Sequence, residues 1–67
     1  MSQTQKRFNM KLINEREFRD YTIVGNGWTM TVSSLSEAKR IWSKMTAAGC
    51  ELRGNRHNGT PAILDSI

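Results

Sequence analysis

The sequence predicts an α+β fold, in which one amphipathic helix packs across one face of a small antiparallel sheet. Three observations lead to this fold class. Short runs alternate apolar and polar residues, which is the period of a half-buried strand. A Gly-Asn-Gly turn separates two such runs. One stretch repeats its apolar residues every three or four positions, as a helix does. The expected order of elements is β-β-β-α-β-β.

The first predicted strand covers Lys6 to Ile13, where Phe8, Met10 and Leu12 alternate with polar residues. The charged residues Asn14 to Glu17 then break the pattern, either as a turn or as a single helical turn. Glu15 and Glu17 both lie next to arginines, and we interpret them as a solvated charge cluster rather than an acid/base pair.

A hairpin is expected next. Tyr21 to Val24 and Trp28 to Val32 are rich in β-formers, and Gly25-Asn26-Gly27 between them accepts the positive φ of a tight turn. A phosphate-binding loop is the weaker interpretation of these glycines, because such a loop leads into a helix and this one leads into a strand.

The predicted helix runs from about Leu35 to Ala48. Ser34 and Glu37 have the spacing of a capping box, and Gly49 stands where a left-handed C-cap belongs. Its apolar stripe consists of Leu35, Ala38, Ile41, Trp42, Met45 and Ala48.

Two further strands are expected after the helix. Cys50 and Leu52 alternate with charged residues in the first of them. His57-Asn58-Gly59 forms a second hairpin turn, and Thr60 to Ile67 returns as the last strand, with Pro61 at its start or on an edge.

The length of 67 residues allows one domain, which we assign to residues 6–67 after a loose tail at residues 1–5. So short a chain has little material for a deep active-site cleft, and we expect no enzymatic activity. The single cysteine and single histidine predict neither a disulfide nor a metal or other cofactor. No run is apolar enough to span a membrane, and the chain is interpreted as cytoplasmic.

Ten Lys and Arg residues against six Asp and Glu residues give a net charge of +4. This excess favours a polyanionic partner, which means nucleic acid, a ribonucleoprotein or an acidic protein surface. Solubility alone is the alternative explanation, because a small domain commonly carries this much charge.

The candidate binding residues lie opposite the apolar stripe of the helix, where Lys39, Arg40, Ser43 and Lys44 form a compact basic patch. Arg53 and Arg56 extend this patch if the next strand ends on the same side as the helix. The alternative is an ordinary solvated helix face, with its cations placed to suit the helix dipole.

Four other side chains have two interpretations each. Cys50 is either a small buried residue or a thiol activated by His57, and His57 is either an exposed turn residue or a pH-sensing or nucleic-acid contact. Trp42 is expected either in the core or as an interface anchor, and Trp28 either in the core or as an exposed platform.

The helix resembles that of a small phage-encoded anti-CRISPR family that inhibits type I-F surveillance complexes. The resemblance lies in Ser34-Leu35-Ser36-Glu37-Ala38-Lys39-Arg40-Ile41 with Ser43-Lys44, and in Gly49, Arg53 and Asn58-Gly59 at similar spacing. It covers Ser34 to about Gly59. It implies a compact sheet-plus-helix protein without enzymatic activity, which docks on the subunits that hold the guide RNA. Lys39, Arg40 and Lys44 would then occupy surface that target DNA uses.

We therefore expect a phage- or prophage-type inhibitor that binds a host nucleoprotein complex in the host cytoplasm and blocks access of nucleic acid. One alternative is a regulator whose helix contacts phosphates of nucleic acid directly. Another is a homodimeric interaction module that pairs through a sheet edge or Trp28. The sequence leaves the partner, the strand order and the oligomeric state open.

Overall fold

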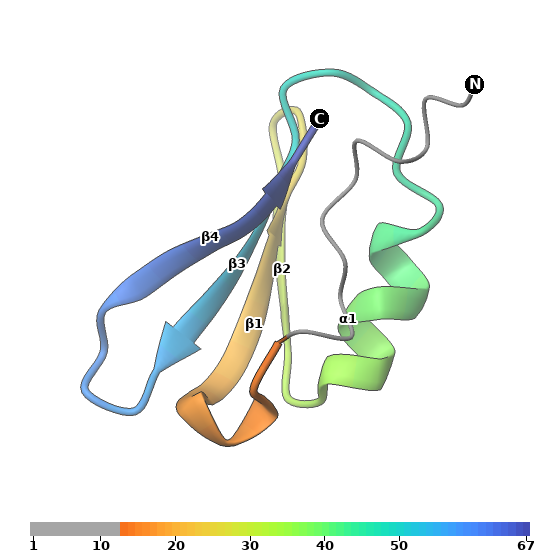
Figure 1. The fold of residues 1–67 in the computed structure, drawn as a ribbon. Coiled ribbons are helices and arrows are strands. Elements are labelled where there is room, and N and C mark those ends of the chain that lie inside the picture. The colour runs from red at the N-terminus through yellow and green to blue at the C-terminus, as the bar shows by residue number, and fades with distance from the viewer. Residues whose placement is uncertain (1–12) are drawn as a thin grey trace.

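A computed structural model of the chain describes residues 13–67 (Figure 1). It contains one antiparallel sheet of four strands in the order β2-β1-β3-β4, with a single α-helix lying on one of its faces. The elements, in chain order, are the 3-10 turn η3 (Glu15–Glu17), β1 (Phe18–Val24), β2 (Thr29–Val32), α1 (Leu35–Trp42), β3 (Glu51–Arg56) and β4 (Pro61–Ser66).

The predicted fold class is confirmed by this arrangement of helix and sheet. The strand predicted at Lys6 to Ile13 lies outside the described residues, except for Ile13, which packs against the core. The described part of the chain therefore has the order β-β-α-β-β. The single helical turn proposed for Asn14 to Glu17 is present as η3, and Asn14 caps it by accepting the N–H of Arg16.

Both predicted hairpins form. In the first, Gly25 N–H donates to Trp28 O at 2.8 Å, and Gly27 takes a φ of 83°, which glycine adopts without strain. In the second, Arg56 N–H donates to Thr60 O at 3.0 Å, and Gly59 has a φ of 93°. Pro61 opens β4 on the edge of the sheet, where its missing N–H leaves no ladder bond unmade.

The pairing of β1 with β3 sorts side chains onto the two faces of the sheet. Ile23 lies opposite Leu52, and both side chains are fully buried beneath the helix layer. Thr22 lies opposite Arg53 one position along, so these two side chains point to the other face. That second face carries no further layer within residues 13–67.

The helix begins as predicted. Ser34 Oγ accepts the N–H of Glu37 at 3.2 Å, which is one half of the predicted capping box. A second cap comes from farther away, because Glu15 Oε2 accepts the N–H of Leu35 at 3.1 Å. A carboxylate at this position also suits the positive end of the helix dipole.

The predicted end of the helix at Ala48 is wrong, because α1 stops at Trp42. Ser43 Oγ donates back to Arg40 O at 2.8 Å, and the next amides bond three residues back instead of four. Gly49 does take the predicted positive φ, at 92°, but it lies six residues beyond Ser43. There its N–H donates to Ile67 O, which ties the connection to the end of β4.

The core lies between α1 and one face of the sheet. Its buried members are Phe18, Tyr21, Ile23, Val32, Leu35, Ala38, Trp42, Cys50 and Leu52. Ala48, predicted as part of the apolar stripe, is exposed because the helix has already ended. No helix in residues 13–67 is long and apolar enough to cross a membrane.

Candidate functional site

Two cations lie on α1, and a third, Lys44, lies two residues beyond its last residue, Trp42. Successive helical residues are rotated by about 100°, so burial of Leu35, Ala38 and Trp42 against the sheet turns other side chains outward. Arg40 and Lys44 are exposed, and Lys39 lies half-buried at the flank. We call Lys39, Arg40 and Lys44 the cationic helix face.

No carboxylate neutralises these three side chains within the described part of the chain. The ion pairs found there join other residues, and Glu37, at the start of the helix, is the nearest acid along the sequence. The cationic helix face thus presents its charge to the surroundings.

Two cations of the sheet, unlike those of the cationic helix face, are paired with carboxylates. Arg19 pairs with Asp20 at 3.3 Å, and Arg53 pairs with Glu51 at 2.8 Å. Such exposed pairs contribute only about 0–1 kcal/mol each to stability. Their effect on the molecule's field is larger, because each removes one positive charge from the surface available to a partner.

Arg53 is not brought together with the cationic helix face. Its cross-strand neighbours are Thr22 and Ile63, on the face of the sheet opposite the helix. Arg53 was expected to extend the basic patch only if its strand and the helix end on the same side. This condition is therefore not met. A contact between Arg53 and a partner stays a prediction.

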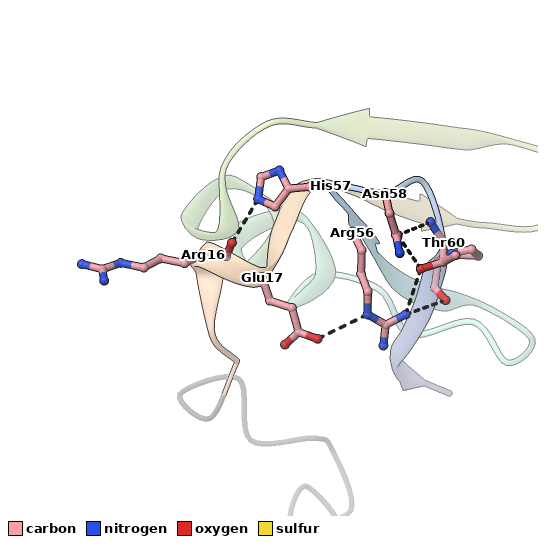
Figure 2. A network of polar contacts seen from close by, with 7 residues as sticks. Arg16, Glu17, Arg56, His57, Asn58 and Thr60 are labelled. Carbon is pink, nitrogen blue, oxygen red and sulfur yellow. Dashed lines mark hydrogen bonds and ion pairs between the residues drawn. The ribbon is translucent and has the colours of Figure 1, made fainter.

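Arg56 lies at the centre of a polar network that holds one end of the sheet together (Figure 2). Its Nε donates to Glu17 Oε2 at 3.3 Å, while Nη1 donates to Thr60 Oγ1 and to Pro61 O. Its guanidinium carbon also lies 6.0 Å from the centre of the Phe18 ring. The structure thus gives Arg56 an internal role, which sequence analysis did not predict.

His57 and Cys50 do not form a nucleophile pair. Cys50 is a free, buried thiol in the core. His57 is exposed in the β3–β4 turn, and its Nε2 lies 3.0 Å from Arg16 O (Figure 2). The interpretations of Cys50 as a buried core residue and His57 as an exposed turn residue agree with this arrangement. Residues 13–67 bring together no group of three or more His, Cys, Asp or Glu able to hold a metal ion.

The two tryptophans take different positions. Trp42 is a core residue with 2% of its surface exposed, and its Nε1 donates to Asp65 Oδ2 at 2.7 Å. Trp28 is 42% exposed, and its ring rests on Gly25, where an added Cβ would overlap it. Trp28 thus has the partial exposure expected of a platform.

The sequence analysis interpreted Glu15 and Glu17 as a solvated charge cluster, but in the structure both carboxylates have partners within the protein. Glu15 caps α1 and Glu17 pairs with Arg56, so both connect η3 to elements far along the chain. No spacing rule in the sequence indicates these contacts, because the partners are 20 and 39 residues away.

The positive charge is unevenly divided along the chain. Lys6, Arg7 and Lys11 lie in residues 1–12, which contain no acid, so residues 13–67 carry seven cations against all six carboxylates. Arg19, Arg53 and Arg56 are paired among those seven. Of the four other cations in the described residues, three form the cationic helix face and the fourth is Arg16.

No family model matches the chain, and neither the curated proteins nor the solved structures include one that is significantly similar to it.

Proposed function

We propose that this chain is a non-enzymatic inhibitor of the phage or prophage type, which binds a host nucleoprotein complex through its cationic helix face. By occupying surface that nucleic acid uses, it blocks access of the nucleic acid to that complex. The proposed target is a type I-F CRISPR surveillance complex, from the resemblance of the helix to anti-CRISPR proteins.

One observation carries the proposal. Lys39, Arg40 and Lys44 have no carboxylate partner within residues 13–67, while three arginines of the same region do. A surface that binds phosphate competitively needs cations that remain available. Charge complementarity of this kind raises the rate of encounter and makes binding sensitive to salt.

The experiment is a competition for target DNA. A reconstituted type I-F complex is mixed with the protein, labelled target duplex is added, and the fraction of complex carrying DNA is measured. We expect wild-type protein to prevent loading. Arg40→Gln with Lys44→Gln is expected to raise the half-inhibitory concentration about tenfold or more, equivalent to about 1.4 kcal/mol of binding free energy.

A matched control distinguishes the effect of where the charge lies from the effect of the protein's net charge. Arg16→Gln with Arg19→Gln removes the same number of positive charges, but from η3 and β1 and not from the cationic helix face. We expect this variant to inhibit within about twofold of wild type. Unhindered DNA loading at saturating wild-type protein contradicts the proposed target.

A mobility-shift measurement with free DNA addresses the alternative of a direct nucleic-acid regulator. The inhibitor is expected to shift neither free duplex nor free single strand at concentrations that block the complex. Tight binding to free DNA, falling steeply with salt, would favour the regulator instead.

A further inference from the structure

Both hairpin turns of the molecule contain the dipeptide Asn-Gly, which is chemically labile. Asn26-Gly27 lies between β1 and β2, and Asn58-Gly59 lies between β3 and β4, at the opposite end of the sheet (Figure 1). The other asparagines of the sequence precede methionine, glutamate or arginine. An asparagine before glycine loses its side-chain amide most readily, because glycine has no side chain that obstructs ring closure.

This loss of the amide, called deamidation, needs only water as a co-reactant. The backbone nitrogen of the glycine attacks Cγ of the asparagine, the new C–N bond closes a succinimide ring, and ammonia leaves with the proton of the glycine N–H. Water then adds to one of the ring carbonyls and opens the ring to aspartate or to isoaspartate. Hydrogen bonds of the glycine N–H or of the asparagine side chain oppose ring closure, because they must break first.

The turn at Asn58-Gly59 holds both reacting groups. The Gly59 N–H, whose nitrogen would attack, donates to Arg56 O at 2.9 Å. Asn58 Oδ1 accepts two hydrogen bonds from Thr60, one from the backbone N–H at 3.0 Å and one from the hydroxyl at 2.8 Å (Figure 2). Ring closure would remove the first bond and reposition the carbonyl that accepts the other two.

The turn at Asn26-Gly27 is held differently. The backbone bond that spans it runs from Gly25 N–H to Trp28 O at 2.8 Å and involves neither residue of the dipeptide. Within residues 13–67, neither the Asn26 side chain nor the Gly27 N–H has a hydrogen-bond partner. Asn26 is exposed, and its Oδ1 lies beside Gly49, which presents no side chain to it. Both groups needed for ring closure are therefore available.

We propose that Asn26 is a site of spontaneous deamidation in the folded protein, and that the fold protects Asn58 from the same reaction. This modification site is independent of the proposed function and of any partner. Deamidation replaces a neutral amide by a carboxylate, so the net charge of the chain falls from +4 to +3. The isoaspartate product also adds a carbon atom to the backbone of the turn that the bond between Gly25 and Trp28 closes.

Peptide mapping of the full-length protein follows the two sites separately. Trypsin cuts after lysine and arginine, so Asn26 lies in peptide 20–39 and Asn58 in peptide 57–67, and neither peptide contains another asparagine. The protein is incubated at mildly alkaline pH, because the glycine nitrogen must lose its proton. Mass spectrometry then measures the deamidated fraction of each peptide over time, and a sample taken before incubation corrects for deamidation during digestion.

We expect Asn26 to deamidate at least about tenfold faster than Asn58 in the folded protein, because ring closure at Asn58 breaks hydrogen bonds. The same incubation in urea isolates the effect of the fold. There we expect the two rates to agree within about threefold, since only the neighbouring residues still differ. Equal rates in the folded protein, a faster rate at Asn58, or a ratio no larger than that in urea would overturn the proposal.

A matched pair of variants provides a second test. Asn26→Gln and Asn58→Gln each lengthen one side chain by a carbon, which slows cyclisation because a larger ring must form. Isoelectric focusing measures how fast an acidic form of the protein accumulates. We expect Asn26→Gln to lower this rate about tenfold and Asn58→Gln to leave it within about twofold of wild type. The reverse order, or equal effects of the two variants, would contradict the assignment of the site to Asn26.

Discussion

The indole nitrogen of Trp42 donates a hydrogen bond of 2.7 Å to Oδ2 of Asp65, and this bond joins α1 to the edge strand β4. Asp65 lies opposite Leu52 in the pairing of β3 with β4, which places its side chain on the helix side of the sheet. A buried indole N–H needs an acceptor, and a carboxylate is a strong one. The contact therefore fixes the helix, and with it the cationic helix face, relative to the sheet.

Replacement of Trp42 by phenylalanine keeps an aromatic ring but removes the donor. We expect Trp42→Phe to lower the free energy of unfolding by about 1–3 kcal/mol, because the Asp65 carboxylate loses its charge-assisted bond to the indole. Urea unfolding followed by far-UV circular dichroism measures the change. Trp28→Phe is the control, since that ring is half-exposed, and a loss as large for Trp28→Phe would contradict the assignment.

Tyr21, unlike Trp42, is a buried aromatic residue whose polar group has no hydrogen-bond partner within the described residues. Its side chain is 1% exposed, and its hydroxyl has no hydrogen-bond partner within the described residues. Because a buried unpaired hydroxyl costs about 1–3 kcal/mol, we expect Tyr21→Phe to leave the free energy of unfolding unchanged or to raise it by about 1 kcal/mol. Chemical unfolding measures this change. Tyr21→Ala is the control for packing at this site, and we expect it to lower the free energy of unfolding by about 3–5 kcal/mol. Clear destabilisation by Tyr21→Phe would show that the hydroxyl has a partner.

The same side chain predicts a dependence of stability on pH. Burial raises the pKa of Tyr21 above 10.0, and the carboxylate of Glu15 raises it further. The unfolded chain thus ionises first, so this contribution to stability is present below pH 10.0 and is lost as pH rises through the folded-state pKa.

Tyr21 is the single tyrosine of the sequence, so tyrosinate absorbance follows this group alone. We expect its midpoint in the folded protein to lie above that in urea. The free energy of unfolding should fall more steeply above about pH 10 in wild type than in Tyr21→Phe, where the lysines still titrate. Equal slopes in the two proteins would refute the predicted linkage.

Gly54 is expected to tolerate no side chain. A Cβ at this position would lie 2.6 Å from Cδ1 of Phe18, whose ring is buried between the sheet and Arg56. Gly54→Ala should lower the free energy of unfolding by about 1–3 kcal/mol through overpacking. Its combination with Phe18→Leu tests the cause, because relief of the overlap makes the two effects less than additive. If the two changes in the free energy of unfolding simply add, the destabilisation by Gly54→Ala does not come from its overlap with Phe18.

The local elements were predictable because they depend on neighbouring residues. Glycines at 25, 27 and 59 mark the two hairpins, and Ser34 marks the start of the helix, through backbone conformations and bonds that span only a few positions. The end of the helix was not predictable from periodicity, since Met45 and Ala48 continue the apolar spacing. Competition from the Ser43 side chain and the tie between Gly49 and Ile67 ended it earlier.

The candidate site was predictable in part for a similar reason. The outward direction of Arg40 follows from helical spacing, whereas Lys44 lies beyond the end of α1. The pairing of Arg53 with Glu51, and of Arg56 with Glu17, depends on which face and which end of the sheet each residue reaches. Those positions follow from the strand order and register, which are set by contacts between residues distant in the sequence.

The most direct measurement is the affinity of the protein for the immobilised surveillance complex at about 50 mM and 200 mM salt. The account predicts that Arg40→Gln with Lys44→Gln weakens binding about tenfold or more and flattens its salt dependence. Arg16→Gln with Arg19→Gln is predicted to retain both the affinity and the salt dependence of wild type. Equal weakening by the two variants, or no weakening by Arg40→Gln with Lys44→Gln, would contradict the claim that the charge of the cationic helix face carries binding.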